Sequence, residues 1–449
     1  MEIPTEFKWR YIFHFTDIRN LDSIIKNGLL CTNAMIKKGL SHQDIANSDI
    51  QQRRAAMKVT CGKGGVVHDY VPFYFTSKNP MFLSVLNKKN HDQPFFIYLC
   101  VKINRLEKDD AVFTSHSANT NNPPTFYDDV NDLNKLDWKQ IDSKKWKFTD
   151  EERRRKMAEA LIFDKMDVAE IDSIVVYNSD VAKIVRWLFE RNGKQAPEIL
   201  FDGGLSNGKY RFFYTKYFFD DRKWETLVMG PYFMRQKYRE LLKDIRQERK
   251  KPRQYKYKDI ASLLQAVAND FCVLPELQGI YGLSTNNIIH TATVDEHTRC
   301  VVENVRQTDC YKSANPNDQK ILLLAAYLHD IGKGPKEKWQ GEVQYIYPDH
   351  PYDAAFGLQR ILSEEIECIE TDDIRRLCLL VLFHDIVGDC LFKGRDRQQI
   401  VRIIADEKDI DMLIALGIAD AKSLNSTWYE QMKYCCKNFK KDIVSRKGL

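Results

Sequence analysis

The feature that most constrains this chain is a series of apolar helical segments in its second half, several of which begin or end with a histidine or an aspartate. Apolar residues recur at helical spacing from about residue 260 onward with little strand pattern, which predicts an all-α half. The segments predicted as helices are 260–271, 296–305, 319–329, 353–366, 374–384, 397–406 and 410–419. The side chains at or near their ends are, in chain order, His297, His329, Asp330, His350, His384, Asp385 and Asp420.

A mixed set of imidazoles and carboxylates is the ligand environment that divalent transition metals or magnesium take in proteins. Each histidine alone would more often be structural, but the ordered series predicts a metal site. An ion held there would lower the pKa of bound water and polarise a phosphoryl oxygen. We therefore expect a divalent metal ion, with Mg, Mn, Ni, Zn and Fe left open.

Four motifs stand in this half: HTATVDEHT at 290–298, LHDIGKG at 328–334, DHP at 349–351 and FHD at 383–385. In these motifs the chain resembles the HD phosphohydrolase superfamily over residues 262–425, above all the HD domains of the multifunctional CCA-adding enzymes. The resemblance implies hydrolysis of phosphomonoesters or phosphodiesters, with the substrate open. It implies metal ligands at His297, His329, Asp330 and Asp420, and residues facing phosphate or a second ion at Lys333, His350 and His384.

The first half mixes strand and helix patterns. Strands are predicted at 11–15, 68–75, 95–101 and 171–177, and a short amphipathic helix at 181–191. The segment 148–163 places three arginines and a lysine, residues 153–156, before Glu159 and an apolar run. One interpretation is a helix with a basic solvated face whose glutamate pairs with its neighbours. The other is a cationic surface beside one catalytic acid.

Six segments in order carry a second resemblance: HFTDIRNLDSIIKNGLL (14–30), IQQRR (50–54), HDYVPFYF (68–75) with NPMF (79–82), FTSHSAN (113–119), TFYDDVNDLNKLDW (125–138) and RRRKMAEALIF (153–163). Over residues 11–190 the chain resembles DarT, a toxin family that ADP-ribosylates thymidine in single-stranded DNA. The resemblance implies a small ADP-ribosyltransferase domain of the α+β class, with a split β-sheet and NAD in its cleft. It also implies a macrodomain antitoxin as partner.

The same resemblance assigns roles to residues. It implies Glu159 as the catalytic acid, and either Arg53 or Arg54, with Arg54 preferred, as the arginine that holds NAD phosphate or acts near the thymine. Cleavage of nicotinamide from NAD develops positive charge on the ribose, which one carboxylate can stabilise, and a guanidinium suits the pyrophosphate. The residues implied to line the NAD pocket or to stack near nicotinamide are His14, Thr16, Asn20, and Tyr70 or Tyr74.

The single strand is expected on another part of the same half. The loop 114–125 would recognise the substrate, and Asp17 stands where many members of the family carry a histidine that contacts NAD. The basic side chains expected to face the strand are Arg153, Arg154, Arg155 and Lys156.

Two further segments leave alternatives open. Residues 210–219 hold seven aromatics in ten, and we favour a buried aromatic strand over a platform on which bases stack. Residues 235–258 hold eleven Lys/Arg against three Asp/Glu along a helical apolar stripe. The basic remainder is either a solvated face or a surface that tracks phosphates.

Composition bounds the class of protein. A hydrophobic content of 43% is ample for packed interiors, and eleven cysteines without a CxxC pair indicate a reducing compartment. No secretory signal is evident and every apolar run is shorter than a bilayer span, so we expect a cytoplasmic protein without a membrane segment. We expect a transferase domain at 1–196, an aromatic and basic connector at 197–256, and an HD-type domain at 257–449.

Together with the two resemblances, these observations predict an NAD-dependent ADP-ribosyltransferase of the toxin or phage-defence type that modifies a base in single-stranded DNA, with thymidine preferred, and that carries a fused HD domain. That domain either hydrolyses a nucleotide or the ADP-ribose pyrophosphate, or senses a nucleotide and gates the transferase. The alternative is an HD phosphohydrolase acting on nucleotides or RNA ends, with the first half as a nucleic-acid-binding module.

Overall fold

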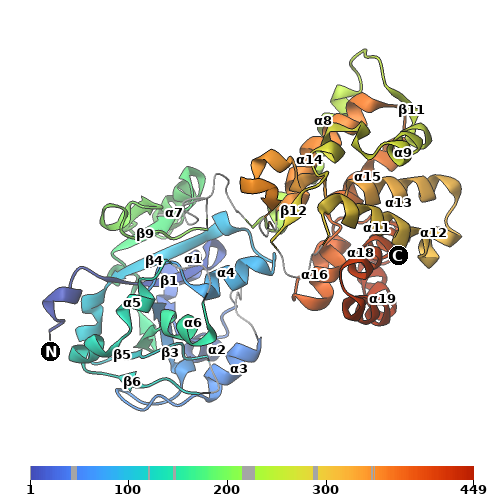
Figure 1. The fold of residues 1–449 in the computed structure, drawn as a ribbon. Coiled ribbons are helices and arrows are strands. Elements are labelled where there is room, and N and C mark those ends of the chain that lie inside the picture. Colours follow the sequence, from blue (N-terminus) through green and yellow to red (C-terminus); the bar gives the residue numbers. More distant parts are fainter. Residues whose placement is uncertain are drawn as a thin grey trace. The chain divides into compact units, whose positions relative to one another are not determined.

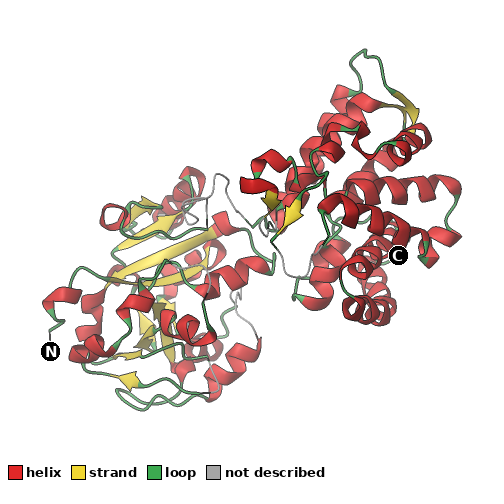
Figure 2. Cartoon of the chain, in the orientation of Figure 1, coloured by secondary structure: helices red, strands yellow, loops and turns green. Residues whose placement is uncertain are grey.

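The computed structural model describes residues 2–41, 48–119, 122–144, 148–214, 228–286, 292–344, 347 and 349–449. The chain forms two compact units. The first comprises 1–87 and 92–225, and the second comprises 88–91 and 226–449. Figure 1 follows the chain through both units, and Figure 2 shows that the strands gather in the first unit while the second is almost entirely helical.

An eight-stranded sheet with the order β10-β9-β4-β1-β3-β7-β5-β6 is the framework of the first unit. Its neighbours pair antiparallel except for β10 and β9, which are parallel. The strands are β1 (Tyr11–Asp17), β3 (Tyr70–Tyr74), β4 (Phe96–Lys102), β5 (Ala111–Thr114), β6 (Phe126–Tyr127), β7 (Glu159–Phe163), β9 (Ser173–Val176) and β10 (Glu198–Phe201). A separate short pair joins β2 (Leu29–Leu30) to β8 (Lys165–Met166).

The two halves of this sheet meet at a single residue pair. β1 pairs with β4 over its whole length, and β3 pairs with β7 over its whole length, but β1 and β3 share only the pair Phe13↔Tyr74. Because neighbouring strands are normally held by several ladder hydrogen bonds, the halves separate beyond this point. The sequence predicted a split sheet, whereas the structure has one mixed eight-stranded sheet whose strands β1 and β3 share a single residue pair.

Apolar alternation and helical stripes account for the elements around the sheet. The helices are α1 (Leu21–Asn27), α2 (Thr32–Lys37), α3 (Ser48–Ala56), α4 (Pro80–Asn87), α5 (Trp138–Ile141), α6 (Asp150–Lys156) and α7 (Ser179–Arg191). α7 begins after Asn178, whose side chain accepts a hydrogen bond from the Val181 backbone, and it buries an apolar stripe in the main core.

The aromatic segment after β10 packs on the opposite face of the sheet, against side chains of β1 and β4 that are not part of that core. Tyr210, Phe212, Phe213 and Tyr214 are buried, and Phe212 packs edge-to-face on Phe13 and Tyr98. The favoured expectation of a buried aromatic segment holds for these residues, although they form no strand. Residues 215–219 lie outside the described residues.

The second unit is built from helices. They are α8 (Pro231–Glu248), α9 (Ile260–Asn269), α10 (Pro275–Gln278), α11 (Val294–Arg306), α12 (Asp309–Ser313), α13 (Pro316–Leu328), α14 (His350–Arg360), α15 (Thr371–Leu382), α16 (Ile386–Phe392), α17 (Gln398–Val401), α18 (Glu407–Leu424) and α19 (Ser426–Lys447). α13 is its centre, because the run Ile321–Leu328 is buried on every side and packs against α9, α11 and α15.

The prediction of an all-α half needs one correction. Two short parallel strand pairs lie among the helices, and each joins segments far apart in the sequence. They are β11 (Tyr257–Asp259) with β14 (Ile366–Cys368), and β12 (Ser284–Thr285) with β13 (Val343–Gln344). Strands of two or three residues carry no periodicity of their own, so sequence pattern does not reveal them.

The boundary between the units falls inside the range 197–256 that was expected to be a connector. β10 and the buried aromatics extend the first unit, whereas α8 packs on α14 and α15 of the second. Within the described residues, no helix has both the length and the apolar character needed to cross a membrane. All eleven cysteines lie in the described residues and are free thiols.

Candidate active site and candidate metal centre

Glu159 is the first residue of β7 and is fully buried. Its carboxylate is held by Arg54 of α3, whose Nη1 donates to Oε1 at 3.1 Å and to Oε2 at 2.8 Å. Burial disfavours the charged guanidinium, but the charge of the Glu159 carboxylate and its hydrogen bond to Arg54 outweigh this effect and raise the pKa of Arg54. The buried ion pair of Arg54 and Glu159 thus lies where β7 begins, beside the end of β3.

The structure distinguishes the two neighbouring arginines of α3. Consecutive residues of an α-helix point about 100° apart, so only one of the pair can reach a given side chain. Arg54 is buried against Glu159, whereas Arg53 is exposed to solvent. The ion pair is therefore specific to Arg54.

The two oxygens of Glu159 have different surroundings. Oε1 also accepts from the Ala118 backbone N–H at 2.9 Å and from the Ser117 hydroxyl at 3.4 Å. Among the described residues, Oε2 accepts only from Arg54. Oε1 is therefore saturated by the protein, and Oε2 is the oxygen with capacity for a further hydrogen bond.

The loop that supplies these donors follows β5. The Ser115 backbone N–H donates to Thr125 O at 3.0 Å and so closes the base of the loop. The Ser117 backbone N–H donates to Arg154 O at 3.1 Å, which ties the loop to α6. This is the loop 114–125 that was expected to recognise substrate, of which residues 120–121 lie outside the described residues. One end of the loop is thus fastened directly to the carboxylate of Glu159.

Tyr74, rather than Tyr70, lies beside Glu159. The register of β3 on β7 pairs Tyr74 with Glu159 and Tyr70 with Phe163 at the opposite end. Burial raises the pKa of Tyr74, and the nearby charge of Glu159 raises it further. Tyr70 is buried in a separate small cluster and its hydroxyl donates to Gly64 O at 2.9 Å.

The residues expected to line an NAD pocket stand on β1 and just after it. His14 donates from Nδ1 to Pro72 O at 2.8 Å, and burial lowers its pKa, so the ring is neutral and its Nε2 is an acceptor. Thr16 is buried and accepts from the Asn20 amide at 3.0 Å. The carboxylate of Asp17 is held by the Arg19 guanidinium at 2.7 and 2.8 Å.

The arginines of α6 are exposed, and two of them are paired with acids nearby. Arg153 donates to Asp150 at 3.3 Å, and Arg155 donates to Glu151 and to Asp137. The pairs within α6 follow the i,i+3 and i,i+4 spacing of ordinary surface ion pairs. The interpretation of a helix with a solvated basic face therefore fits these two residues.

Arg154 and Lys156 differ from that pair. Arg154 is exposed and forms no ion pair within the described part of the chain, which leaves its guanidinium available. Lys156 points inward and donates to the carbonyls of Ile141 and Ser143 at 2.9 and 2.8 Å. Burial lowers the pKa of Lys156 to about 8. The expectation that Lys156 faces a DNA strand is therefore wrong, because its side chain is part of the interior.

Comparison with known proteins places this unit in a family. The family model described as "ssDNA thymidine ADP-ribosyltransferase, DarT" matches residues 13–204. The DNA ADP-ribosyl transferase of Thermus sp. (strain 2.9) is 33% identical over 193 residues, which cover 42% of this chain and 88% of that protein. The chain belongs to the DarT family.

One further relative agrees with this membership. The DNA ADP-ribosyl transferase of Escherichia coli O127:H6 is 30% identical over 183 residues, covering 38% of this chain and 83% of that protein. The solved structure of Thermus sp. 2.9 DarT in complex with ADP-ribosylated ssDNA matches with 28% identity and a TM-score of 0.41, covering 47% of this chain and 100% of that one. The first unit is called the DarT unit below.

The second unit brings its histidines and aspartates together in two groups. The ligand atoms within each group lie within 4.8 Å of one another. The first group is His297, His329 and Asp420, and the second is Asp330, His350 and His384. They come from the ends or first turns of α11, α13, α14, α15 and α18, so the helix termini predicted from the sequence converge on one place.

All four histidines present Nε2 to these groups as an acceptor. His329, His350 and His384 each donate from Nδ1 to a backbone carbonyl at 2.8 Å. His297 donates from Nδ1 to the Ser423 hydroxyl at 2.9 Å, and that hydroxyl donates onward to Asp420 O at 2.6 Å. A histidine that donates from Nδ1 is in the tautomer that binds a metal through Nε2.

This arrangement fits a bound cation. The Nε2 atoms of His297 and His329 are 3.4 Å apart, and those of His350 and His384 are 3.0 Å apart. Two nitrogen lone pairs facing each other at such distances repel unless positive charge lies between them. The donor set therefore suits one divalent ion in each group.

Asp330 lies between the two groups. Its Oδ2 is 3.3 Å from His329 Nε2, and its Oδ1 is 3.3 Å from His350 Nε2. Burial opposes ionisation, but Lys333, which donates to Oδ2 at 2.5 Å, and the neighbouring histidines hold the pKa of Asp330 well below its ordinary value. The aspartate that was grouped with the first ligand set thus offers one oxygen to each group.

Sequence reasoning left two contributors out of the ligand set. Asp385 Oδ1 lies 3.5 Å from His384 Nε2, and the repeated His-Asp pair was the signal that could have included it. Ser423 fixes the tautomer of His297 three residues after Asp420. No sequence signal marks this serine, because only the packing of α11 on α18 brings it to the ring.

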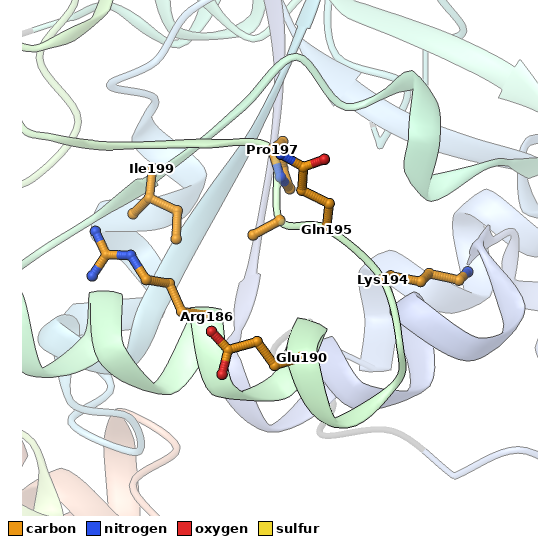
Figure 3. A pocket seen from close by; sticks show the side chains of 7 residues that line it. Arg186, Glu190, Lys194, Gln195, Pro197 and Ile199 are labelled. Atoms are coloured by element: carbon orange, nitrogen blue, oxygen red, sulfur yellow. The ribbon is translucent and has the colours of Figure 1, made fainter.

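A cavity of about 300 Å³ lies elsewhere on the DarT unit. Figure 3 shows Arg186 and Glu190 of α7 on one side of it, and Pro197, just before β10, and Ile199 of β10 on the other. Its lining contains none of the residues predicted for NAD or for catalysis. We therefore do not assign it to the transfer reaction.

Proposed function

We propose that the DarT unit transfers ADP-ribose from NAD to a thymidine base in single-stranded DNA. The observation that carries this proposal is the buried Arg54–Glu159 pair at the start of β7 in a chain of the DarT family. The family description and the names of the relatives support the choice of NAD and DNA.

Glu159 would supply the electrostatic part of the reaction. Cleavage of the bond between nicotinamide and ribose develops positive charge on the ribose, and a fixed carboxylate stabilises it. Oε1 is saturated by Arg54, Ser117 and Ala118, so the carboxylate is oriented before substrate binds. Oε2 would then face the ribose and accept the proton that the attacking base loses.

The other residues of the site would hold the substrates. We assign the NAD pocket to His14, Thr16, Asn20 and Tyr74, which lie along and beside the junction of the two sheet halves. Arg154 is the α6 arginine that we assign to the DNA strand, together with the loop that ends at Thr125. By family resemblance we also propose a macrodomain protein as the partner that removes the modification.

The substrate proposal is tested by the release of nicotinamide. Incubation of the full chain with NAD is expected to release nicotinamide faster when a thymidine-containing single strand is added. The same strand annealed to its complement should stimulate little, because a paired base must first leave the duplex. Equal stimulation by the duplex, or by a strand without thymidine, would contradict the proposal.

We further propose that the second unit is a metal-dependent phosphohydrolase of the HD type. Divalent ions held by the two groups would supply an activated water and a Lewis acid for a phosphoester. Of the chain's own residues, Asp330 would join the two groups, Ser423 would orient His297, and Lys333 would hold Asp330 ionised. The observation that favours this function is the set of four histidines with Nε2 directed inward.

A metal-content measurement tests this second proposal. After equilibration with Mn²⁺ and desalting, the full chain is expected to retain about two ions per molecule, as one per group. Asp330→Asn should lose most of both, because the amide replaces the one anionic ligand that both groups share. Asp309→Asn, at an exposed aspartate of α12, is the matched control and should retain both. Full retention in Asp330→Asn would refute the assignment.

A further inference from the structure

Four basic side chains lie along one exposed face of α8 and the turn after it. They are Arg239, Lys243, Arg246 and Lys250, called the α8 stripe here. The spacing of four, three and four residues keeps them on one face. The buried face, which includes Met234, packs on α14 and α15, and Arg239 is five residues further on, about 140° around the helix.

The α8 stripe has no role in folding that the structure reveals. Within the described residues, none of its four side chains forms an ion pair, and each step brings like charges to adjacent positions. Such like-charge neighbours destabilise a helix. Within the described residues, none of the three acids of α8 forms an ion pair with the stripe, and Glu248 pairs instead with Lys251 at 2.7 Å.

Other cations of the same region are used by the fold. Arg249 donates from Nη1 to the carbonyls of Leu362 and Ile366, both at 2.8 Å, and so closes the end of the α14 segment. Lys237 lies 4.1 Å from the ring centre of Phe356. Part of the basic excess in the sequence therefore has structural partners, whereas the α8 stripe forms no ion pair within the described residues.

An exposed aromatic ring continues the stripe. Tyr232 is 47% exposed and stands seven residues, two helical turns, before Arg239, so it lies on the same line. Exposed rings interleaved with cations bind single strands, because bases stack on the rings while the cations neutralise phosphates. The four cations alone extend over about 16 Å at 1.5 Å per residue.

We propose that the α8 stripe binds the phosphate backbone of single-stranded DNA, so that the second unit holds the strand that the DarT unit modifies. The identity of the strand rests on the proposed function, but the binding itself does not require the reaction. Each neutralised phosphate releases counterions, which makes the affinity fall with salt. A strand long enough to engage both units gains affinity by effective concentration, and a short strand does not.

The test is a binding titration of the full chain without NAD. Fluorescein-labelled thymidine-containing strands of 30 and 8 nucleotides are titrated by anisotropy at several salt concentrations. The wild type is expected to bind the 30-mer more tightly than the 8-mer. Replacing all four stripe residues by glutamine should weaken the 30-mer about tenfold or more at low salt. It should lower the slope of log K against log salt by about 3, at roughly 0.7 per phosphate contact.

Controls separate the stripe from bulk charge and from misfolding. Lys437→Gln with Lys441→Gln removes charge from exposed positions of α19 and should change the slope little. The smaller variant Lys243→Gln with Arg246→Gln should lower the slope by about half as much as the fourfold one. Unchanged binding of the 30-mer by the fourfold variant would overturn the proposal.

Two further outcomes would also overturn it: an equal loss in the α19 variant, or a tenfold preference of the stripe for RNA of the same sequence. A failed transfer assay with intact stripe-dependent binding would instead count against the proposed function alone.

Discussion

Glu159→Gln is expected to lower kcat/KM for transfer to a single strand by at least about 10²–10³-fold, the range seen when one preorganised electrostatic group is removed from an active site. Glutamine keeps the size and the hydrogen-bonding reach of the side chain, but it removes the negative charge that would face the ribose. In free energy this loss is about 3–4 kcal/mol of transition-state stabilisation. The measurement is the initial rate of product formation over a range of NAD concentrations.

Whether the loss of activity in Glu159→Gln falls on kcat or on KM gives a second test of the role of Glu159. Because Glu159 acts on charge that develops during the reaction, the loss should fall on kcat, with the KM for NAD changed little. Glu190→Gln, at an exposed glutamate of α7, removes the same charge from the DarT unit and should leave both constants near wild type. A Glu159→Gln enzyme with more than a tenth of the wild-type kcat would refute the assigned role.

Arg54→Ala and Arg53→Ala are expected to differ sharply. Removal of Arg54 leaves the Glu159 carboxylate buried without its cation, which costs about 3–5 kcal/mol when one partner of a buried pair is lost. Transfer should fall at least about 10²-fold, because the carboxylate is no longer fixed. Arg53 is exposed, so its removal should change stability by less than about 0.5 kcal/mol.

Thermal unfolding and transfer rates of the two variants form a matched comparison, since each removes one guanidinium from the same helix. Addition of Arg54→Lys tests geometry, because lysine keeps the charge but loses the planar donor pair. It should recover part of the stability and little of the activity. Damage from Arg53→Ala equal to that from Arg54→Ala would mean that the ion pair is not the centre of the site.

The sequence predicted that histidines and aspartates converge in the second unit, because the ends of its helices can be recognised from the apolar pattern. Apolar runs such as Ile321–Leu328 must be buried, so the polar residues that terminate them are brought to the ends of a shared core. What the pattern could not give is the sharing of Asp330 between two groups, which depends on the direction of its two oxygens. Tertiary packing alone decides that direction.

In the DarT unit, the family resemblance left two candidate residues for each of two roles, and only the structure distinguishes between the candidates. Tyr70 and Tyr74 are four residues apart on one strand and share a face, so period-two alternation treats them alike. The register of β3 on β7 sets Tyr74 opposite Glu159. Likewise, the 100° turn between Arg53 and Arg54 separates them only once the position of α3 is known.

The basic run before Glu159 shows the limit of reading charge from a sequence. Arg153, Arg155 and Lys156 lie within four consecutive residues, but the two arginines pair with acids and the lysine is an interior donor to backbone carbonyls. A cluster of like charges in sequence is therefore divided by the helix into different environments. The α8 stripe was the less conspicuous pattern, although none of its residues forms an ion pair in the described structure.

The predicted helix boundaries were wrong where a side chain hydrogen-bonds to the backbone at a helix end. The predicted helix 397–406 is only α17, because Asp406 accepts from the Asp409 backbone and begins α18 instead. The predicted helix 353–366 is α-helical only to Arg360 and continues as a π-helix over Ile361–Glu365, in which the Leu362 carbonyl accepts from Arg249. The long α19 was missed altogether, since its cysteines and lysines blur the apolar stripe.

The measurement that tests the central claim most directly is the intact mass of a short thymidine-containing single strand after incubation with the full chain and NAD. The account predicts a gain of one ADP-ribose on that strand and none on a matched strand in which every thymidine is replaced. A mass that stays unchanged with folded protein and NAD present would contradict the claim that this DarT unit is a DNA ADP-ribosyltransferase.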